Sequence, residues 1–426
     1  MSSPTAPADA TLVDLRAPPD HSLAVTQASP VAVTDDRSAR AGLASAVRTT
    51  VLPRLEVVGD TPRLVSDVRA RFETAEVLGR GGVGEVSLAR DNDIDRPVAV
   101  KRLLPELDDP GLVARFVDEI RVLGQLDHPN IVPIHDVGVD ADGRYFYVMK
   151  YVEGETLEHV VDRLVEGDPE YHRRYTFERR VEVFRQILRG VQYAHSRGVI
   201  HRDIKPANVM VGRFGEVVVM DWGLARKVHD ERSSFPVSDK AKTLTAPAAP
   251  RGGSPKLRTQ VGALLGTPAY MSPEQAKGEV ERIDERSDVY ALCVMFHEML
   301  TLEHYLARKG TVTEALAGVL RDPVPFATGV KSPHQGSVPA ELAHFIAHGV
   351  SKDPAGRYRS VTEMLDRLQS IEEGHCPVEC PATFAKRMNT EIGHMVDRRP
   401  LVMLGVALAV IAMAVGGLGL LVATRA

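Results

Sequence analysis

The most constraining feature of this chain is a short polar stretch between residues 201 and 223. It reads His201-Arg-Asp-Ile-Lys-Pro-Ala-Asn208 and, after the apolar run Val217-Val-Val-Met220, it continues as Asp221-Trp-Gly223. We expect the apolar run to be a strand that presents Asp221 at its end. This order brings a candidate general base, a lysine that can contact phosphate and two candidate magnesium ligands into one short span.

The order of these residues resembles the catalytic loop and the metal-binding loop of the eukaryotic-type protein kinases. Phosphoryl transfer needs metal, charge and alignment more than covalent chemistry, and this set can supply all three. The resemblance implies that Asp203 accepts or orients the proton of a substrate hydroxyl and that Lys205 contacts the transferring phosphate. It also implies that Asn208 and Asp221 hold magnesium, with manganese as an alternative ion. Lys205 two residues after Asp203 is the form of this loop found in serine/threonine kinases.

A second motif, Gly79-Arg-Gly81-Gly-Val-Gly84-Glu-Val86, fits the pattern G-x-G-x-x-G-x-V. Glycines let the backbone approach phosphates without a Cβ clash, although a dinucleotide-binding turn has a similar pattern. Here we expect the loop to lie between two strands and to be followed by Val98-Ala-Val-Lys101, an order that favours a kinase nucleotide lid. The resemblance implies an ATP site formed by residues of this loop, of the following strand and of the hinge: Leu78, Gly79, Gly81, Gly84, Val86, Lys101, Lys150 and Val152.

The helix expected after Lys101 has Asp109 as its N-cap and Pro110 at its first position. Apolar residues recur along it at helical spacing: Val113, Phe116, Val117, Ile120 and Leu123. One face of the helix is therefore buried. Glu119 flanks this face, and we expect it to pair with Lys101 in a clamp on the nucleotide phosphates. Asp118, on the wetter face, is the competing choice.

The segment Gly266-Thr-Pro-Ala-Tyr-Met-Ser-Pro-Glu274 resembles the end of a kinase activation segment, with Thr267 in the substrate-facing wall. The resemblance also implies an ion pair between Glu274 and Arg357 and a role for Asp288 in bracing the backbone of the catalytic loop. The residue sequence of these motifs is similar to that of bacterial serine/threonine kinases.

Arg202, directly before Asp203, is the arrangement seen in kinases that are switched by phosphorylation of the activation segment. A guanidinium at this place can pair with a phosphate. Among the serines and threonines of the segment we favour Thr259, which follows Lys256 and Arg258. The length of this segment is also typical of a mobile insertion.

Two positions depart from the family pattern. Lys150 stands in the hinge where glutamate is common, but the hinge contacts adenine through its backbone. Trp222 stands where the family usually has phenylalanine, and we expect it to stack between Leu123 and His201 with Asp288 beneath. An indole is larger than a phenyl ring and carries an N–H donor, so the site is enlarged nearby or the N–H reaches a polar group.

The composition divides the chain into four parts. Residues 1–71 contain no aromatic residue and are rich in Ala, Pro, Ser, Thr and Asp, so we expect a disordered leader. Residues 72–371 carry the resemblance to protein kinases. It implies an α+β fold of two lobes, a small β-rich N-lobe at 72–152 and a mainly helical C-lobe at 153–371. Residues 372–400 form a juxtamembrane segment.

The fourth part is a predicted transmembrane helix at residues 401–423. Leu401–Val422 carries no charged residue, and at about 1.5 Å per residue it spans about 33 Å, enough to cross a hydrocarbon core of about 30 Å. More basic residues precede this span than follow it: Lys386, Arg387, Arg398 and Arg399 before it, Arg425 after it. The positive-inside rule therefore predicts a single-pass protein of the cytoplasmic (inner) membrane with its kinase domain in the cytoplasm.

The bulk numbers exclude several other classes. A net charge of −5 on 426 residues gives no indication of a nucleic-acid partner. Three cysteines, Cys293, Cys376 and Cys380, do not make a disulfide framework. The pair Cys376 and Cys380 has an adjacent histidine but lacks a second ligand pair, so a closed zinc site is not supported.

These features predict a membrane-anchored serine/threonine kinase that transfers the γ-phosphoryl group of ATP to serine and threonine hydroxyls of proteins. A homodimer that phosphorylates itself in trans stays open. The main alternative is a membrane-tethered pseudokinase scaffold. A small-molecule kinase of related fold is a second alternative, but such enzymes generally lack the Gly-Thr-Pro…Ser-Pro-Glu segment that shapes a peptide site.

Overall fold

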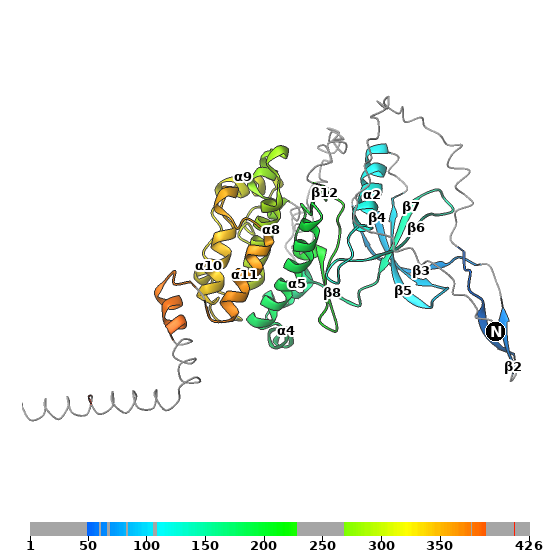
Figure 1. The fold of residues 1–426 in the computed structure, drawn as a ribbon, viewed down its shortest axis with the longest axis horizontal. Coiled ribbons are helices and arrows are strands. Elements are labelled where there is room, and N and C mark those ends of the chain that lie inside the picture. The colour runs from blue at the N-terminus through cyan, green and yellow to red at the C-terminus, as the bar shows by residue number, and fades with distance from the viewer. Residues whose placement is uncertain are drawn as a thin grey trace, which may run out of the picture. The chain divides into compact units, whose positions relative to one another are not determined.

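The computed structural model describes residues 49–58, 61–65, 69–81, 84–104, 109–227, 268–375 and 377–388, together with Met413. In this part of the chain a β-rich lobe comes first and a mainly helical lobe follows (Figure 1). This order confirms the predicted two-lobed α+β architecture.

The first lobe is built on a five-stranded antiparallel sheet with the order β3-β4-β5-β7-β6. Its strands are β3 (Phe72–Arg80), β4 (Gly84–Asp91), β5 (Arg96–Leu103), β6 (Ile134–Val139) and β7 (Tyr145–Lys150). Alternate residues of the central strands face opposite sides, as the period of two requires. Val98 and Val100 belong to a small cluster on one face, whereas Ala99 and Tyr147 belong to the main core on the other. This alternation aims Lys101 towards the helical lobe.

The hairpin between β4 and β5 has a short turn. The two strands extend to Asp91 and from Arg96. Asp95 adopts a left-handed conformation with φ of 52°, which closes this short turn.

Helix α2 (Pro110–Leu123) crosses the sheet on the side of the main core. Asp109 is its N-cap, as predicted, and accepts a hydrogen bond from the backbone N–H of Gly111. The ring of Phe116 packs on that of Tyr147 in β7 at a centroid distance of 5.5 Å. The buried face of α2 also carries Glu119, so the packing of the helix fixes the position of this carboxylate.

The helical lobe is arranged around α8 (Glu285–Thr301) (Figure 1). The residues of α8 are buried around most of its circumference. Phe296 of α8 stacks on Phe184 of α5 at 4.0 Å, and Phe345 of α10 meets both rings edge-on. The helices are α3 (Leu157–Val165), α4 (Pro169–Arg174), α5 (Phe177–Ser196), α7 (Pro273–Lys277), α8 (Glu285–Thr301), α9 (Val312–Arg321), α10 (Ala340–Gly349) and α11 (Val361–Glu372). Short 3-10 turns are η2 (Pro206–Asn208), η5 (Val280–Arg282), η6 (Ala327–Gly329) and η7 (Pro354–Gly356).

Short strands between the lobes carry the polar stretch of residues 201–223. They are β8 (Gly154–Thr156), β9 (Val199–Ile200), β10 (Val209–Gly212), β11 (Val217–Val219) and β12 (Arg226–Lys227). They pair in the orders β11-β10-β8 and β12-β9. The side chain of Asn130 donates to the carbonyl of Val217 at 2.9 Å, which ties β11 to the loop after α2. Asp221 follows β11 closely, at the strand end where the sequence predicts it.

Part of the expected leader has regular structure. Strands β1 (Arg54–Val58) and β2 (Thr61–Val65) pair in antiparallel fashion, which corrects the expectation of disorder for these residues. The carboxylate of Asp93 accepts the backbone N–H groups of both Val51 and Leu52. A side chain of the first lobe thus holds the two residues that shortly precede β1. Residues 1–48 lie outside the described residues.

The described residues contain no helix that is long and apolar enough to span a membrane. The predicted span at 401–423 lies outside them, except for Met413.

Candidate active site

The ammonium group of Lys101 joins the two lobes. Its Nζ lies 2.7 Å from Oε1 of Glu119 and 3.2 Å from Oδ1 of Asp221. Burial disfavours the charged lysine, but the two carboxylates outweigh it and raise the pKa of Lys101. Asp118 pairs instead with Arg121 on the exposed side of α2, so the structure selects Glu119 as the partner of Lys101.

Glu119 is almost fully buried, with 4% of its side chain exposed. The hydroxyl of Tyr147 donates to the same oxygen, Oε1, at 2.7 Å. Burial raises the pKa of Glu119, and the contacts with Lys101 and Tyr147 oppose that rise. Two donors therefore converge on one buried carboxylate, as a buried charge requires.

The catalytic loop forms a second polar cluster. Lys205 Nζ lies 2.7 Å from Oδ2 of Asp203. Asn208 donates through Nδ2 to the backbone carbonyl of Asp203 at 2.8 Å and to Oδ2 of Asp203 at 3.1 Å. The backbone carbonyl of Asn208 accepts from Met220 at 2.8 Å. Lys205 and Asn208 thus both contact Asp203, and Asn208 is also connected to the strand end that carries Asp221.

Asp288, fully buried at the start of α8, holds the backbone of this loop. Its carboxylate accepts the backbone N–H groups of His201 at 2.8 Å and of Arg202 at 2.9 Å. His195 Nε2 lies 2.8 Å from the same carboxylate. Desolvation opposes ionisation here, but the hydrogen bond from His195 and the nearby donors lower the pKa of Asp288. The bracing contact predicted for Asp288 is present.

Two residues of the site adopt left-handed backbone conformations. Arg202 has φ of 68° and Asp221 has φ of 56°. Such strain costs about 1–3 kcal/mol per residue, so surrounding contacts must hold it. For Arg202 these include the bond to Asp288 and a bond from Gln275 of α7 to the Arg202 carbonyl at 2.9 Å.

The oxygen donors of Asn208 and Asp221 fit a magnesium ion. Magnesium is usually bound by one or two carboxylates together with substrate phosphates. Because Asn208 Nδ2 faces Asp203, the amide oxygen is the group that Asn208 can offer to a cation. Asp221 has 48% of its side chain exposed, which leaves room for a ligand beside the oxygen that contacts Lys101.

Trp222 occupies the interior between the lobes. It is completely buried, its ring lies 4.5 Å from that of His201, and it belongs to the same core cluster as Leu123. Its Nε1–H donates to the carbonyl of Val219 at 3.4 Å. The structure therefore shows the contact with His201, and the indole N–H reaches a polar group, the second of the two expected solutions.

Comparison with known proteins decides the family. The sequence matches the protein kinase domain family over residues 72–368. This chain belongs to the protein kinase family. The match begins at Phe72, where the sequence analysis places the start of the two-lobed part of the chain.

The most similar relatives are bacterial serine/threonine kinases. The chain is 35% identical to serine/threonine-protein kinase PknD of Protochlamydia amoebophila, over 74% of this chain and 31% of the relative. It is 34% identical to serine/threonine-protein kinase PknB of Mycobacterium tuberculosis, over 78% of this chain and 47% of the relative. The chain thus matches less than half the length of each. Among solved structures, the kinase domain of Mycobacterium tuberculosis PknI has a TM-score of 0.47 and 22% identity, covering 71% of this chain and 96% of that chain.

The predicted nucleotide-binding residues of the kinase domain lie on β3, β4 and β5, in the loop between β3 and β4, and at or just after the end of β7. Leu78 and Gly79 are near the end of β3, and Val86 in β4 packs against the main core. The backbone N–H of Gly81 donates to the carbonyl of Gly84 at 2.8 Å, which folds the loop back on itself. Gly82 and Val83 lie outside the described residues. Lys150 ends β7 with an exposed side chain, and Val152 beyond it is buried.

The ion pair predicted between Glu274 and Arg357 is present deep in the helical lobe. Two bonds of 2.8 and 2.9 Å connect the carboxylate to the guanidinium, and Ser287 donates a third at 2.6 Å. Desolvation would raise the pKa of Glu274, but the bonds from Arg357 and Ser287 lower it to about 2. With 2% and 0% of the two side chains exposed, this pair connects α7 to the segment before α11.

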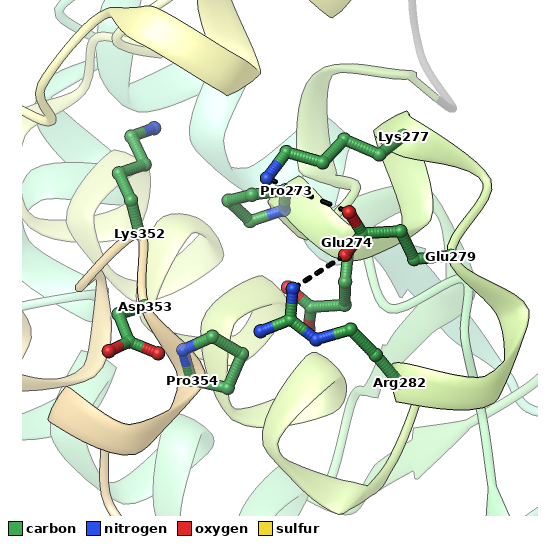
Figure 2. A pocket seen from close by; sticks show the side chains of 8 residues that line it. All are labelled: Pro273, Glu274, Lys277, Glu279, Arg282, Lys352, Asp353 and Pro354. Atoms are coloured by element: carbon green, nitrogen blue, oxygen red, sulfur yellow. Dashed lines mark hydrogen bonds and ion pairs between the residues drawn. The ribbon is translucent and has the colours of Figure 1, made fainter.

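A pocket opens beside this ion pair (Figure 2). Figure 2 shows Lys277 and Arg282 directed at Glu279, with ion-pair distances of 3.9 and 2.8 Å. Burial lowers the pKa of Lys352, on the opposite side, to about 8, and its Nζ donates to the Tyr290 hydroxyl at 2.9 Å. The charged groups of this pocket serve the packing of the helical lobe, and none of them belongs to the cluster around Lys101.

Three of the residues named in the sequence analysis lie outside the described residues. Thr259 and Thr267 fall within residues 228–267, and Cys376 is a separate position outside the described ranges. Cys380 is a free thiol in the structure.

Three contacts of the site were missed from the sequence: Tyr147 with Glu119, His195 with Asp288, and Gln275 with the Arg202 carbonyl. Each of these residues lies far along the chain from its partner. Tyr147 belongs to an apolar strand and His195 to an amphipathic helix, where the local pattern alone indicates only burial in the core. The signal that could have found them is a polar group at a position where the pattern demands an apolar one.

Proposed function

We propose that this chain is a membrane-anchored serine/threonine protein kinase that transfers the γ-phosphoryl group of ATP to hydroxyl groups of proteins. The observation that carries the proposal is the simultaneous assembly of the two polar clusters. Lys101 bridges Glu119 and Asp221, while Asp203 contacts Lys205 and Asn208. Within each cluster the polar groups lie within hydrogen-bonding distance of a shared charged partner, Lys101 in the first and Asp203 in the second.

Each group has a role that its surroundings support. The carboxylate of Asp203 is held by its contacts with Lys205 and Asn208. It is there to accept or direct the proton of a substrate hydroxyl. Lys101, kept charged by its acidic neighbours, contacts the nucleotide phosphates, and Lys205 contacts the phosphoryl group in transfer. Asn208 and Asp221 hold the divalent ion, which neutralises phosphate charge when bound.

The nucleotide base fits the apolar surface near the hinge. Leu78, Val86 and Val152 provide apolar groups there, and the backbone after Lys150 provides hydrogen-bonding groups. The Lys150 side chain is exposed, which is compatible with recognition through the backbone alone.

A direct test is transfer of labelled γ-phosphoryl to a generic protein substrate, with ATP and magnesium. The full chain should label the substrate, and Asp203→Asn should lower the rate by at least about a hundred-fold, as removal of a general base in a preorganised site does. Nucleotide binding without transfer in the unmodified chain would instead identify a pseudokinase scaffold.

We also propose control by autophosphorylation of the activation segment, in cis or between two copies. Arg202 is supported as the phosphate receptor by its place directly before Asp203 and by the contacts of its backbone with Asp288 and Gln275. Thr259 is the preferred site from the neighbouring basic residues. Phosphosite mapping of active protein should find phosphate between Ser233 and Thr267, and active protein without it would contradict this control.

The membrane anchor rests on the uncharged run Leu401–Val422 and the basic residues before it. We propose a single span with the kinase domain in the cytoplasm. Protease added to intact cells should leave the kinase domain whole, whereas digestion of that domain would refute the orientation.

A further inference from the structure

The contact between Tyr147 and Glu119 has no counterpart in the motifs that identify the family. Tyr147 lies in the middle of β7 and is 2% exposed. Its hydroxyl donates to Oε1 of Glu119 at 2.7 Å. Burial and the adjacent Glu119 carboxylate raise the pKa of Tyr147 well above its ordinary value, so the phenol stays a proton donor wherever the fold is stable.

Tyr147 reaches α2 at two points, one turn apart. Its hydroxyl contacts Glu119, and its ring packs on Phe116 with centroids 5.5 Å apart. Residues three apart on a helix share one face. The Tyr147 side chain therefore contacts that face of α2 through one polar and one apolar interaction. The orientation of α2 against β7 therefore fixes where the carboxylate of Glu119 lies.

Lys101 alone cannot hold the Glu119 carboxylate in this position. Lys101 Nζ is divided between Glu119 at 2.7 Å and Asp221 at 3.2 Å, and its proposed role directs it to nucleotide phosphates as well. The Tyr147 hydroxyl has its contact with Glu119 alone among the hydrogen bonds that the described residues show for it. A buried carboxylate that shares its lysine needs a second donor, and Tyr147 supplies one that makes no contact with Asp221.

We propose that Tyr147 is a positioning residue of the phosphoryl-transfer site. It holds the Glu119 carboxylate, and with it α2, in the place from which Glu119 orients Lys101. This inference rests on the proposed function. It assigns to β7, the strand that ends at the hinge, a direct influence on the phosphate clamp.

The test is Tyr147→Phe in the full chain, which removes one oxygen and keeps the ring on Phe116. We expect kcat/KM for ATP to fall about ten-fold, the factor for losing a hydrogen bond to a charged group. The KM for the protein substrate should stay within about two-fold. Tyr145→Phe is the matched control: it removes a hydroxyl from the same strand, two residues away, and should leave both parameters unchanged.

A double-mutant cycle with Glu119→Leu, which keeps an extended side chain but has no acceptor for the Tyr147 hydroxyl, separates positioning from general packing. If Tyr147 acts through Glu119, Tyr147→Phe should cost less than about two-fold in the Glu119→Leu background. An equal loss in both backgrounds, or no loss in the unmodified background, would overturn the proposal.

The double-mutant cycle can also be measured through nucleotide binding, without phosphoryl transfer. Trp222 is the only tryptophan, so its emission can report binding of magnesium-ATP, and the same ten-fold coupling should be present in the dissociation constant. If the unmodified chain binds nucleotide but transfers no phosphate, the proposed function fails, and the binding cycle still decides the role of Tyr147.

Discussion

At the scale of single residues, the site depends on groups that each serve more than one partner. Lys101 is shared by two carboxylates, and Asp288 receives two backbone donors and one imidazole. Such shared contacts make the effects of substitutions non-additive. Trp222 is an exception, because it contributes a ring and one long hydrogen bond to the interior.

We predict that Trp222→Phe keeps phosphoryl transfer within about three-fold. The ring packs on His201 and donates only a 3.4 Å bond to Val219. The smaller ring leaves a cavity, so the free energy of unfolding should fall by about 1–3 kcal/mol. Steady-state rates and chemical unfolding measure the two effects.

The emission of Trp222 gives an independent check of its place. Because it is completely buried, its fluorescence should be blue-shifted and protected from a soluble quencher. Water-exposed emission in nucleotide-bound protein would show that the indole lies elsewhere.

At the scale of elements, close approach of backbones sets what the strands and helices tolerate. A Cβ on Gly84 would lie 2.8 Å from the carbonyl oxygen of Arg102 in the neighbouring strand, whereas one on Gly79 would meet nothing within 4 Å. The buried pair of Glu274 and Arg357 is the corresponding polar constraint on the helices.

We predict that Gly84→Ala destabilises the nucleotide-free protein by about 1–3 kcal/mol, because β4 or β5 must shift to relieve the overlap. Gly79→Ala should change stability by less than about 1 kcal/mol, since the unfolded chain loses some entropy and nothing clashes. Thermal unfolding of the two variants measures the difference. Equal losses would mean that the glycine loop is not packed as described.

The ion pair predicts a pH dependence. The pKa of Glu274 is lowered from 4.5 to about 2 in the folded protein, so its stabilisation, roughly 3 kcal/mol, is fully present above about pH 5. It is lost as the pH falls from about 5 through about 2. The stability difference between the unmodified chain and Glu274→Gln should therefore shrink over this range in urea unfolding.

At neutral pH, Glu274→Gln should cost about 3–5 kcal/mol, because Arg357 becomes a buried unpaired charge. Glu279→Gln is the matched control: it breaks the surface pair with Arg282 and should cost less than about 1 kcal/mol. Equal effects of the two substitutions would contradict a dominant role for the buried pair.

At the scale of the whole molecule, the fold and the clustered site were predictable because their residues lie in contiguous motifs. Asp203, Lys205 and Asn208 are neighbours in sequence, and Glu119 could be chosen from the apolar period of α2. The contact of Tyr147 with Glu119 was not predictable, because it depends on how β7 packs on α2. The pairing of β1 with β2 was missed because the composition of a segment without aromatic residues carries no signal for backbone pairing between two short strands.

The chain as a whole is proposed to join a kinase domain to a membrane. The proposed transfer site takes residues from both lobes of residues 72–371, and its expected product is a phosphate ester on a protein hydroxyl.

The most direct measurement of the proposed chemistry is the phosphoamino-acid content of protein labelled by the purified chain with γ-labelled ATP and magnesium. We predict label on serine and threonine, none after addition of a metal chelator, and at least about a hundred-fold less with Asp203→Asn. Undiminished label with Asp203→Asn, or label only on tyrosine or on small molecules, would contradict this chemistry.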